Sequence, residues 1–128
     1  MAYESPSITL GTLTAAADLS AKQYHFVKLA SATTVNVCTA TTDRAIGILQ
    51  NNPTSGQQAI VQIFGISKVV ADGTIAFNNV IGTSADSQAD AIVPGTDTSV
   101  VTLGVAVQAA SAGETFTMFL NPTSCRAA

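Results

Sequence analysis

Two segments of this chain place glycine and apolar residues in the same order, and this repeat is the feature that most constrains the fold. AIGILQNNPTSGQQAIVQIFG (45–65) aligns without gaps with TLGVAVQAASAGETFTMFLN (102–121). At a constant offset of 57 residues, Gly47 falls on Gly104 and Gly56 falls on Gly113. Each copy has the pattern of an apolar strand interrupted by glycine, a polar turn that ends in glycine, and a second alternating strand.

A glycine inside an apolar strand marks a bulge, a tight bend or the close approach of another backbone. Gly47 and Gly104 interrupt their strands at equivalent places, so we expect close backbone packing at both. The hairpins before the two units, FVKLASATTVNV and NVIGTSADSQADAIV, are also similar at a shifted offset. The pattern indicates two similar halves, about residues 23–65 and 75–121, unless β-hairpins resemble one another through composition alone.

Strand patterns run through most of the chain. Short apolar or alternating segments, many of them rich in Val, Ile and Thr, are separated by turn signals such as NNPTSG and Asp72-Gly73. This spacing predicts an all-β fold over residues 22–128, a small β-barrel or β-sandwich of about eight short strands. No helical pattern is long enough to change that class.

Residues 1–21 have the character of an extended N-terminal arm. They are rich in Ser, Thr and Ala, with isolated apolar residues at Ile8, Leu10 and Leu13. Nothing close in sequence could bury these side chains, and ordering a free segment costs about 1–2 kcal/mol per residue. We therefore expect the arm to order by adding a strand to a partner, with Tyr3 and residues 8–13 as the contacts. The alternative is a tail without a role.

The charge of the chain is low. Charged residues make up 10% of its 128 residues and hydrophobic residues 47%, whereas an ordinary domain is about 25% charged. The polar surface must consist of Thr, Ser, Asn and Gln, which suits a surface covered by neighbouring proteins. A net charge of −3 with five basic residues argues against nucleic acid as a partner. No apolar run predicts a membrane span and no secretory signal is expected, so synthesis in a cytosol is expected.

The sequence contains no motif for catalysis, a metal or a cofactor. His25 is the single histidine, which leaves a transition-metal site without enough ligands. A Ser–His–acid arrangement would need His25 as its base, and no G-x-S-x-G motif is present to place the serine, so a small enzyme that uses His25 is an alternative without a supporting motif. Cys38 and Cys125 have no motif spacing, and we expect no disulfide between them. Asp43 and Arg44 precede a buried strand, where they could form an ion pair or an Asx-turn, or present Arg44 to a partner. We expect an interaction protein rather than an enzyme, with no cofactor and no metal.

Four passages together span roughly residues 18–121. They are LSAKQYHFVKL, ATTDRAIGILQNNPTSGQQAIVQIFGISKVVADGTI, IGTSADSQADAI and LGVAVQAASAGETFTMFL. These passages resemble the small capsid cement, or head decoration, proteins of tailed bacteriophages. Within the second passage, the part from Asp43 to Val69 is the most specific to the resemblance, and it contains no active site.

The resemblance implies a small β protein that binds the outside of an expanded phage head between capsomers and stabilises the shell. Its partners would be the major capsid protein and other copies of the chain in a homotrimer, on the exterior of a virion assembled in the bacterial cytoplasm. The expected capsid or subunit contacts are Tyr3, Ile8, Leu10, Leu13 and Arg44. The alternative is a carbohydrate-binding or adhesin-like β-sandwich of a virion fibre or cell surface. Against it, the chain has no Trp and only two Tyr to stack on sugars.

Overall fold

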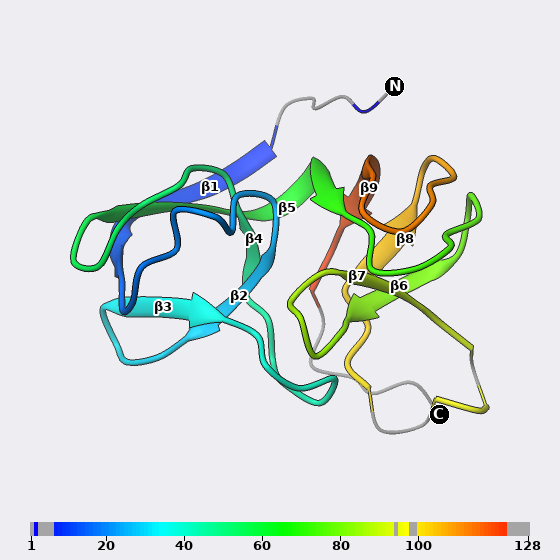
Figure 1. The fold of residues 1–128 in the computed structure, drawn as a ribbon, viewed down its shortest axis with the longest axis horizontal. Helices are drawn as coiled ribbons and strands as arrows, with labels where there is room; N and C mark the ends of the chain where they lie inside the picture. The colour runs from blue at the N-terminus through cyan, green and yellow to red at the C-terminus, as the bar shows by residue number, and fades with distance from the viewer. Residues whose placement is uncertain (1, 3–6, 94, 98–99, 123–128) are drawn as a thin grey trace.

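The computed structural model describes residues 2, 7–93, 95–97 and 100–122 of the chain. These residues form nine strands of one sheet, whose two halves lie side by side in Figure 1. The strands are β1 (Ser7–Ala15), β2 (Phe26–Leu29), β3 (Thr34–Val37), β4 (Gly47–Leu49), β5 (Gln58–Val70), β6 (Val80–Thr83), β7 (Ala89–Ile92), β8 (Gly104–Ala106) and β9 (Thr115–Leu120). Within this described part, no helix is long and apolar enough to cross a membrane.

The sheet closes on itself twice. Its strand order is β1-β3-β2-β4-β5-β9-β8-β6-β7, and β1 also pairs with β5. The first ring therefore consists of β1 to β4 and residues 58–65 of β5. The second ring consists of residues 65–70 of β5 and β6 to β9, and the parallel bridge Ala71–Ala89 closes it. Gly65, with a φ of 106°, lies where β5 passes from the first ring to the second.

The two rings repeat the same pairing register. In the hairpin β2–β3, Val27 pairs with Val37, and in β6–β7, Ile81 pairs with Ala91, an offset of 54 residues for both partners. Further matching pairs are Ile48–Gln62 and Val105–Phe119 at offset 57, and Ala15–Val35 and Ala71–Ala89 where the rings close. Turns of slightly different length change the number of residues that separates equivalent positions of the two rings. The order of the strands and the pairing between them are the same in both rings.

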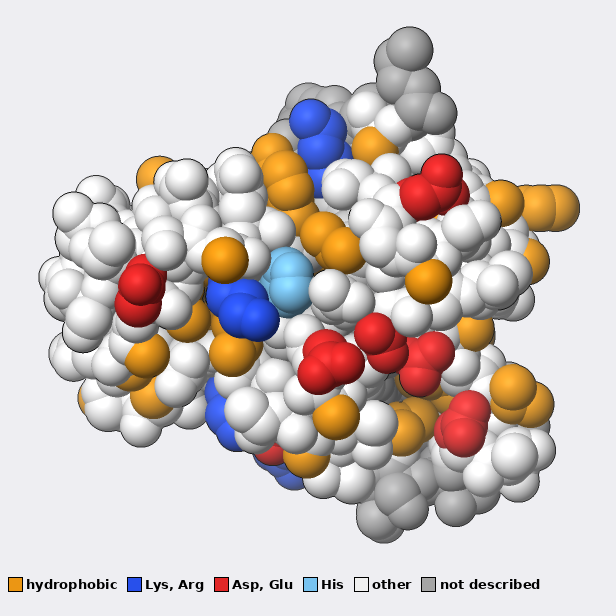
Figure 2. All heavy atoms as spheres, in the orientation of Figure 1, with side chains coloured by type: hydrophobic (Ala, Val, Ile, Leu, Met, Phe, Trp, Pro, Cys, Tyr) orange, Lys and Arg blue, Asp and Glu red, His pale blue; other side chains and the backbone are white. Residues whose placement is uncertain are grey.

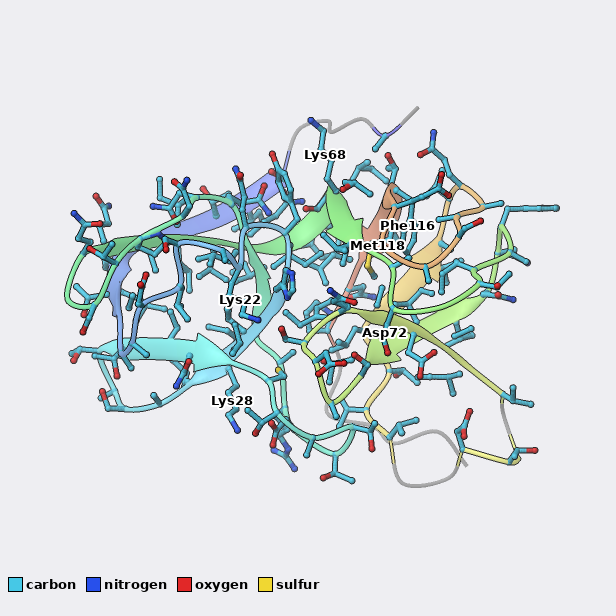
Figure 3. The ribbon with its side chains drawn as sticks, in the orientation of Figure 1. Lys22, Lys28, Lys68, Asp72, Phe116 and Met118 are labelled. Atoms are coloured by element: carbon cyan, nitrogen blue, oxygen red, sulfur yellow. The ribbon has the colours of Figure 1, made fainter. Side chains whose placement is uncertain are left out.

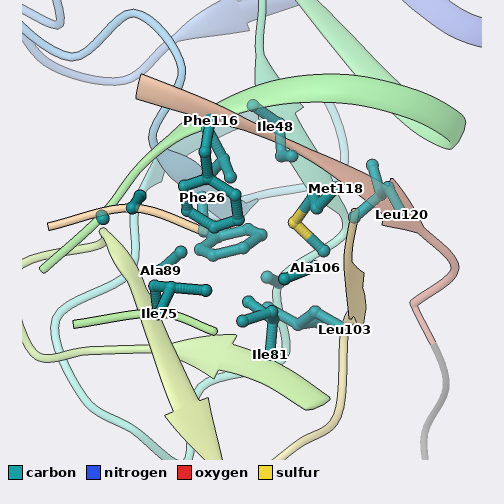
Figure 4. Packing of buried hydrophobic residues seen from close by; sticks show 14 of the residues in the cluster. Phe26, Ile48, Ile75, Ile81, Ala89, Leu103, Ala106, Phe116, Met118 and Leu120 are labelled. Atoms are coloured by element: carbon teal, nitrogen blue, oxygen red, sulfur yellow. The ribbon is translucent and has the colours of Figure 1, made fainter. Parts of the chain in front are cut away.

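Each ring has its own core, and the two cores correspond. The first core consists of Leu13, Ala15, Leu19, Val27, Val35, Leu49, Ala59 and Val61. In the same order, the counterparts in the second core are Val69, Ala71, Ile75, Ile81, Ala89, Ala106, Phe116 and Met118. Figure 3 shows Phe116 and Met118 in the second half of the molecule. The second core also includes residues of the first ring, among them Phe26 and Ile48, as Figure 4 shows.

These observations confirm the all-β class and the two similar halves. The described residues form nine strands where the sequence predicts about eight, and one sheet makes two rings instead of a single regular barrel or sandwich. The halves also begin earlier than residues 23 and 75. β1 is the first strand of one ring, and the second part of β5 is the first strand of the other.

Residues 7–15 of the expected arm form the first strand of the first ring. β1 pairs with β5 along most of its length and with β3 at its end. The expectation that the apolar residues of this segment have no neighbours to bury them is wrong for Leu13, which packs with Ala59 and Val61. Those partners lie far along the chain, so reasoning from neighbours in sequence could not find them.

Candidate interaction surface

An open cavity of about 580 Å³ lies on the first ring, and its wall is mostly apolar. The large apolar side chains of the wall are Leu10, Leu13, Leu29, Ile46, Ile63 and Phe64. Leu29 and Phe64 are exposed at the cavity, and Arg44 adds a cation to its wall. Exposed large apolar side chains around a hollow are typical of a contact surface for another molecule.

A register shift in β1 brings Leu10 and Leu13 to the same cavity. In a regular strand, residues three apart point to opposite faces of the sheet. Here Leu10 pairs with Val61 and Leu13 with Ala59, so β1 contains one residue more than the strand opposite. This is the geometry of a β-bulge, which changes the face to which the following side chains point.

Asp43 fixes the loop that carries Arg44. Its Oδ2 accepts hydrogen bonds from Lys28 Nζ at 2.8 Å and from the backbone N–H groups of Thr39 at 2.8 Å and Ala40 at 3.1 Å. Figure 3 shows Lys28 projecting from β2. Partial burial opposes ionisation, but these donors hold the pKa of the Asp43 carboxyl below its ordinary value. Asp43 thus closes a turn and pairs with Lys28, and Arg44 is exposed at the cavity.

The structure brings three of the five predicted contact residues to this cavity, namely Leu10, Leu13 and Arg44. Ile8 lies beside it, 56% exposed and paired with Phe64 of the cavity wall. Tyr3 lies outside the described residues. The cavity is therefore the place where most of the residues singled out from sequence meet.

The sequence pattern assigns no role to Leu29 or Phe64, the two most exposed apolar residues of the wall. Leu29 ends a strand before a polar turn, and Phe64 precedes Gly65, where β5 leaves the first ring. A large apolar residue beside a turn or a strand-bending glycine has few neighbours from its own ring to bury it. The turn after Leu29 and the glycine after Phe64 are therefore the features of the sequence that could have indicated their exposure.

Backbone packs closely against Gly47 and Gly104. A Cβ on Gly47 would lie 2.0 Å from the carbonyl oxygen of Gln62, and a Cβ on Gly104 would lie 2.0 Å from that of Phe119. Both acceptors are 15 residues further along the chain, so the two contacts are repeats of one another. No side chain fits at either position without a shift of the backbone.

Gly56 and Gly113 occupy matching turns. Their φ angles are 83° and 84°, a backbone conformation that favours glycine. The Gly56 N–H donates to the Ala15 carbonyl at 2.9 Å, and the Gly113 N–H donates to the Ala71 carbonyl at 2.8 Å. The turn in each unit is thereby attached to the first strand of its own ring.

His25 is buried where the two rings meet, and Figure 2 shows its side chain between the two halves. Its Nδ1 lies 2.7 Å from Ser87 Oγ. Burial, together with the charge of Lys22, lowers the pKa of His25. Burial also raises the pKa of the Cys38 thiol to about 12. Cys125 lies outside the described residues. Among the residues that the structure describes, no group of three His, Cys, Asp or Glu could hold a metal ion. His25 and Cys38 are features of the contact between the rings.

Among solved structures, the fold is similar to that of the N base of the head fibre gp8.5 of bacteriophage phi29. The TM-score is 0.67, and the match covers 91% of this chain and 95% of that chain at 15% sequence identity. At this identity the likeness shows a shared fold. No family model matches the chain, and no curated protein matches its sequence.

Proposed function

We propose that this chain is a structural protein of a phage virion, a decoration protein that binds the outside of the expanded head and stabilises the shell. The observation that carries the proposal is the fold shared with the N base of a phage head fibre over nearly the whole chain. The resemblance of residues 18–121 to head decoration proteins supports the proposal separately, because it rests on sequence passages. The partners are the major capsid protein and other copies of the chain, as a homotrimer.

The surface of the molecule suits this role. Charged residues are 10% of the chain, so few charges lose their hydration when neighbouring proteins cover the surface. The cavity of the first ring and the exposed Ile8 beside it supply an apolar contact region, and Arg44 supplies a cation at its wall. Several such contacts from linked copies would hold the protein on a shell more firmly than one contact could.

The aromatic side chains of this region do not favour the carbohydrate-binding alternative. None of the residues that line the cavity is Trp or Tyr. The aromatic ring of its wall, Phe64, contacts Phe119 edge to face at 5.5 Å and 80°. A sugar-binding platform needs an accessible aromatic face, commonly with a polar group beside it.

Binding of the purified chain to expanded heads that lack it tests the proposal, with heads of the phage that encodes it. We expect saturable binding at a fixed number of copies per capsomer, and heads that resist heat better when decorated. Ile8→Ser, at a residue 56% exposed beside the cavity, should weaken binding. Val93→Ser is the matched control, since Val93 is 55% exposed and follows β7 in the other half. Binding that does not saturate, or heads that gain no stability, would contradict the proposal.

A further inference from the structure

The contact between the rings buries an outer face of the first ring. Phe26 and Ile48 alternate with residues that fill the first ring, so they point out of it, yet both are fully buried in the core of the second ring. Gln62 pairs with Ile48 and is 2% exposed. Gln50 Nε2 donates to Ser67 Oγ of β5 at 3.0 Å. Phe26, Ile48, Gln50 and Gln62 are called the covered face below.

Among the residues that the structure describes, nothing comparable covers the corresponding face of the second ring. By the pairing register, the counterparts of the covered face are Val80, Val105, Val107 and Phe119. Phe119 and Val107 are exposed, and Val80 and Val105 are half-buried. All four residues of this uncovered face are apolar, whereas two of the four on the covered face are glutamine. The face that the chain leaves open is thus more apolar than the face that it buries, which is typical of a contact surface.

The second ring also contains the site into which the covered face of the first ring packs. Phe26 and Ile48 share a buried cluster with Val69, Val101, Leu103 and Leu120 of the second ring. Beside that cluster, the side chain of Thr83 lies next to the thiol of Cys38. By register, the counterparts of these five second-ring residues are Leu13, Arg44, Ile46, Ile63 and Leu29.

All five of these counterparts line the open cavity of the first ring. The second ring therefore has its receiving site filled by the covered face, and the first ring has the equivalent site open. Within its described residues, one chain carries an open receiving site and an open apolar face, and these are the two sides of a contact that it already makes internally.

We infer that the uncovered face of one copy docks into the cavity of a second copy of this chain, head to tail. The contact repeats between copies the contact that joins the two rings within one chain. A second copy is the occupant because it presents the face that the equivalent site already accepts. Head-to-tail contacts are heterologous, so they build closed rings or longer assemblies. The inference does not depend on the capsid, although it supplies contact surfaces for the self-association in the proposed function.

Charge placed on each side of the contact tests the inference. Val107→Lys should disrupt the uncovered face, where Val107 is 38% exposed, and Leu29→Lys should disrupt the cavity, where Leu29 is 51% exposed. Sedimentation velocity on the full chain, with Cys125 kept reduced, should show oligomers for the unaltered chain and monomers for each variant. Ile60→Lys is the matched control, because Ile60 is 37% exposed, close to the 38% of Val107, but belongs to neither surface. It should assemble like the unaltered chain.

Mixing the two variants shows whether the contact is head to tail. The Val107→Lys chain keeps its cavity, which Val107 does not line, and the Leu29→Lys chain keeps its apolar face, so one contact can form between them. We expect the mixture to give dimers and nothing larger, with far-ultraviolet circular dichroism unchanged. A monomeric unaltered chain at its highest soluble concentration, a mixture that stays monomeric, or normal assembly of the Leu29→Lys chain would each overturn the inference. Because no heads are used, failure here leaves the binding of single chains to heads to be decided separately.

Discussion

The two rings have the same skeleton and different surroundings. They share strand order, pairing register, the glycine contacts at Gly47 and Gly104, and corresponding cores. They differ in whether an outer face is buried. The second ring buries one outer face of the first ring, whereas nothing among the described residues buries the corresponding face of the second ring. The difference appears in the outward side chains, with Gln62 in one ring and Phe119 in the other. Backbone contacts thus preserve the repeat, while the outer faces change with what covers them.

The largest contrast that we expect is in stability, between alanine substitutions of two equivalent residues that point out of their rings. Phe26→Ala removes a ring that is fully buried between the halves, and should lower the free energy of unfolding by about 4 kcal/mol. Val80→Ala, at the counterpart, should cost roughly 1 kcal/mol in the isolated chain, because Val80 is half-buried. Urea denaturation measures both. Equal losses would mean that the two faces are not covered unequally.

A methyl group at either close-packed glycine should destabilise the fold strongly. Gly47→Ala and Gly104→Ala each place a Cβ 2.0 Å from a carbonyl oxygen of the neighbouring strand. The strands must separate, so the free energy of unfolding should fall by roughly 3 kcal/mol in each variant. Gly73→Ala is the control, since nothing lies within 4 Å of its added Cβ. Melting temperatures that match the control would show that backbone contact does not hold the repeat together.

The turn glycines should give smaller effects that are equal in the two rings. Gly56→Ala and Gly113→Ala meet no neighbouring atom, and both must hold a positive φ that alanine disfavours. Each change should lower the free energy of unfolding by about 1 kcal/mol. Thermal denaturation of the two variants side by side is the measurement. A clear inequality would show that the two turns do not have the same role.

His25 should make stability depend on pH, and this effect is the smallest of the four. Its pKa is lowered from the ordinary 6.5, first by burial and then by Lys22, while Asp86 acts in the opposite direction. The unfolded chain therefore binds the proton more readily, and the contribution of neutral His25 is present above pH 6.5 and is lost as the pH falls below it. His25→Asn, which places the residue of the second ring (Asn79) here, should remove that part of the pH dependence. Identical pH profiles in urea denaturation would contradict this role.

The sequence predicts the all-β class and the repeat because glycines at backbone contacts and apolar alternation are both local signals. Gly47 and Gly104 are visible at one offset because β4–β5 and β8–β9 have turns of equal length. The hairpin β6–β7 follows at a different offset, which blurs the repeat. β1 was not identifiable as a core strand, because its partner in β5 is about fifty residues away.

The candidate surface is predictable only in part for a related reason. Leu10, Leu13 and Arg44 stand out in sequence as isolated apolar or charged residues, and the structure brings them to one cavity. Leu29 and Phe64 look like ordinary strand residues, and their exposure depends on where the second ring lies. The open or covered state of a face is a tertiary property, so the alternating pattern that places a residue on that face does not reveal it.

Disulfide trapping tests most directly the claim that the contact between the rings recurs between copies. Within the chain, His25 Nδ1 lies 2.7 Å from Ser87 Oγ, and the counterparts of these two residues are Asn79 and Thr33, neither of which is buried. A chain with Thr33→Cys, Asn79→Cys and Cys125→Ser should form disulfide-linked dimers and larger species on oxidation, reversed by reductant. Cys38 should not interfere, because burial raises its thiol pKa to about 12. Only monomers, or no more cross-linking than in a control with Ile60→Cys in place of Thr33→Cys, would contradict the account.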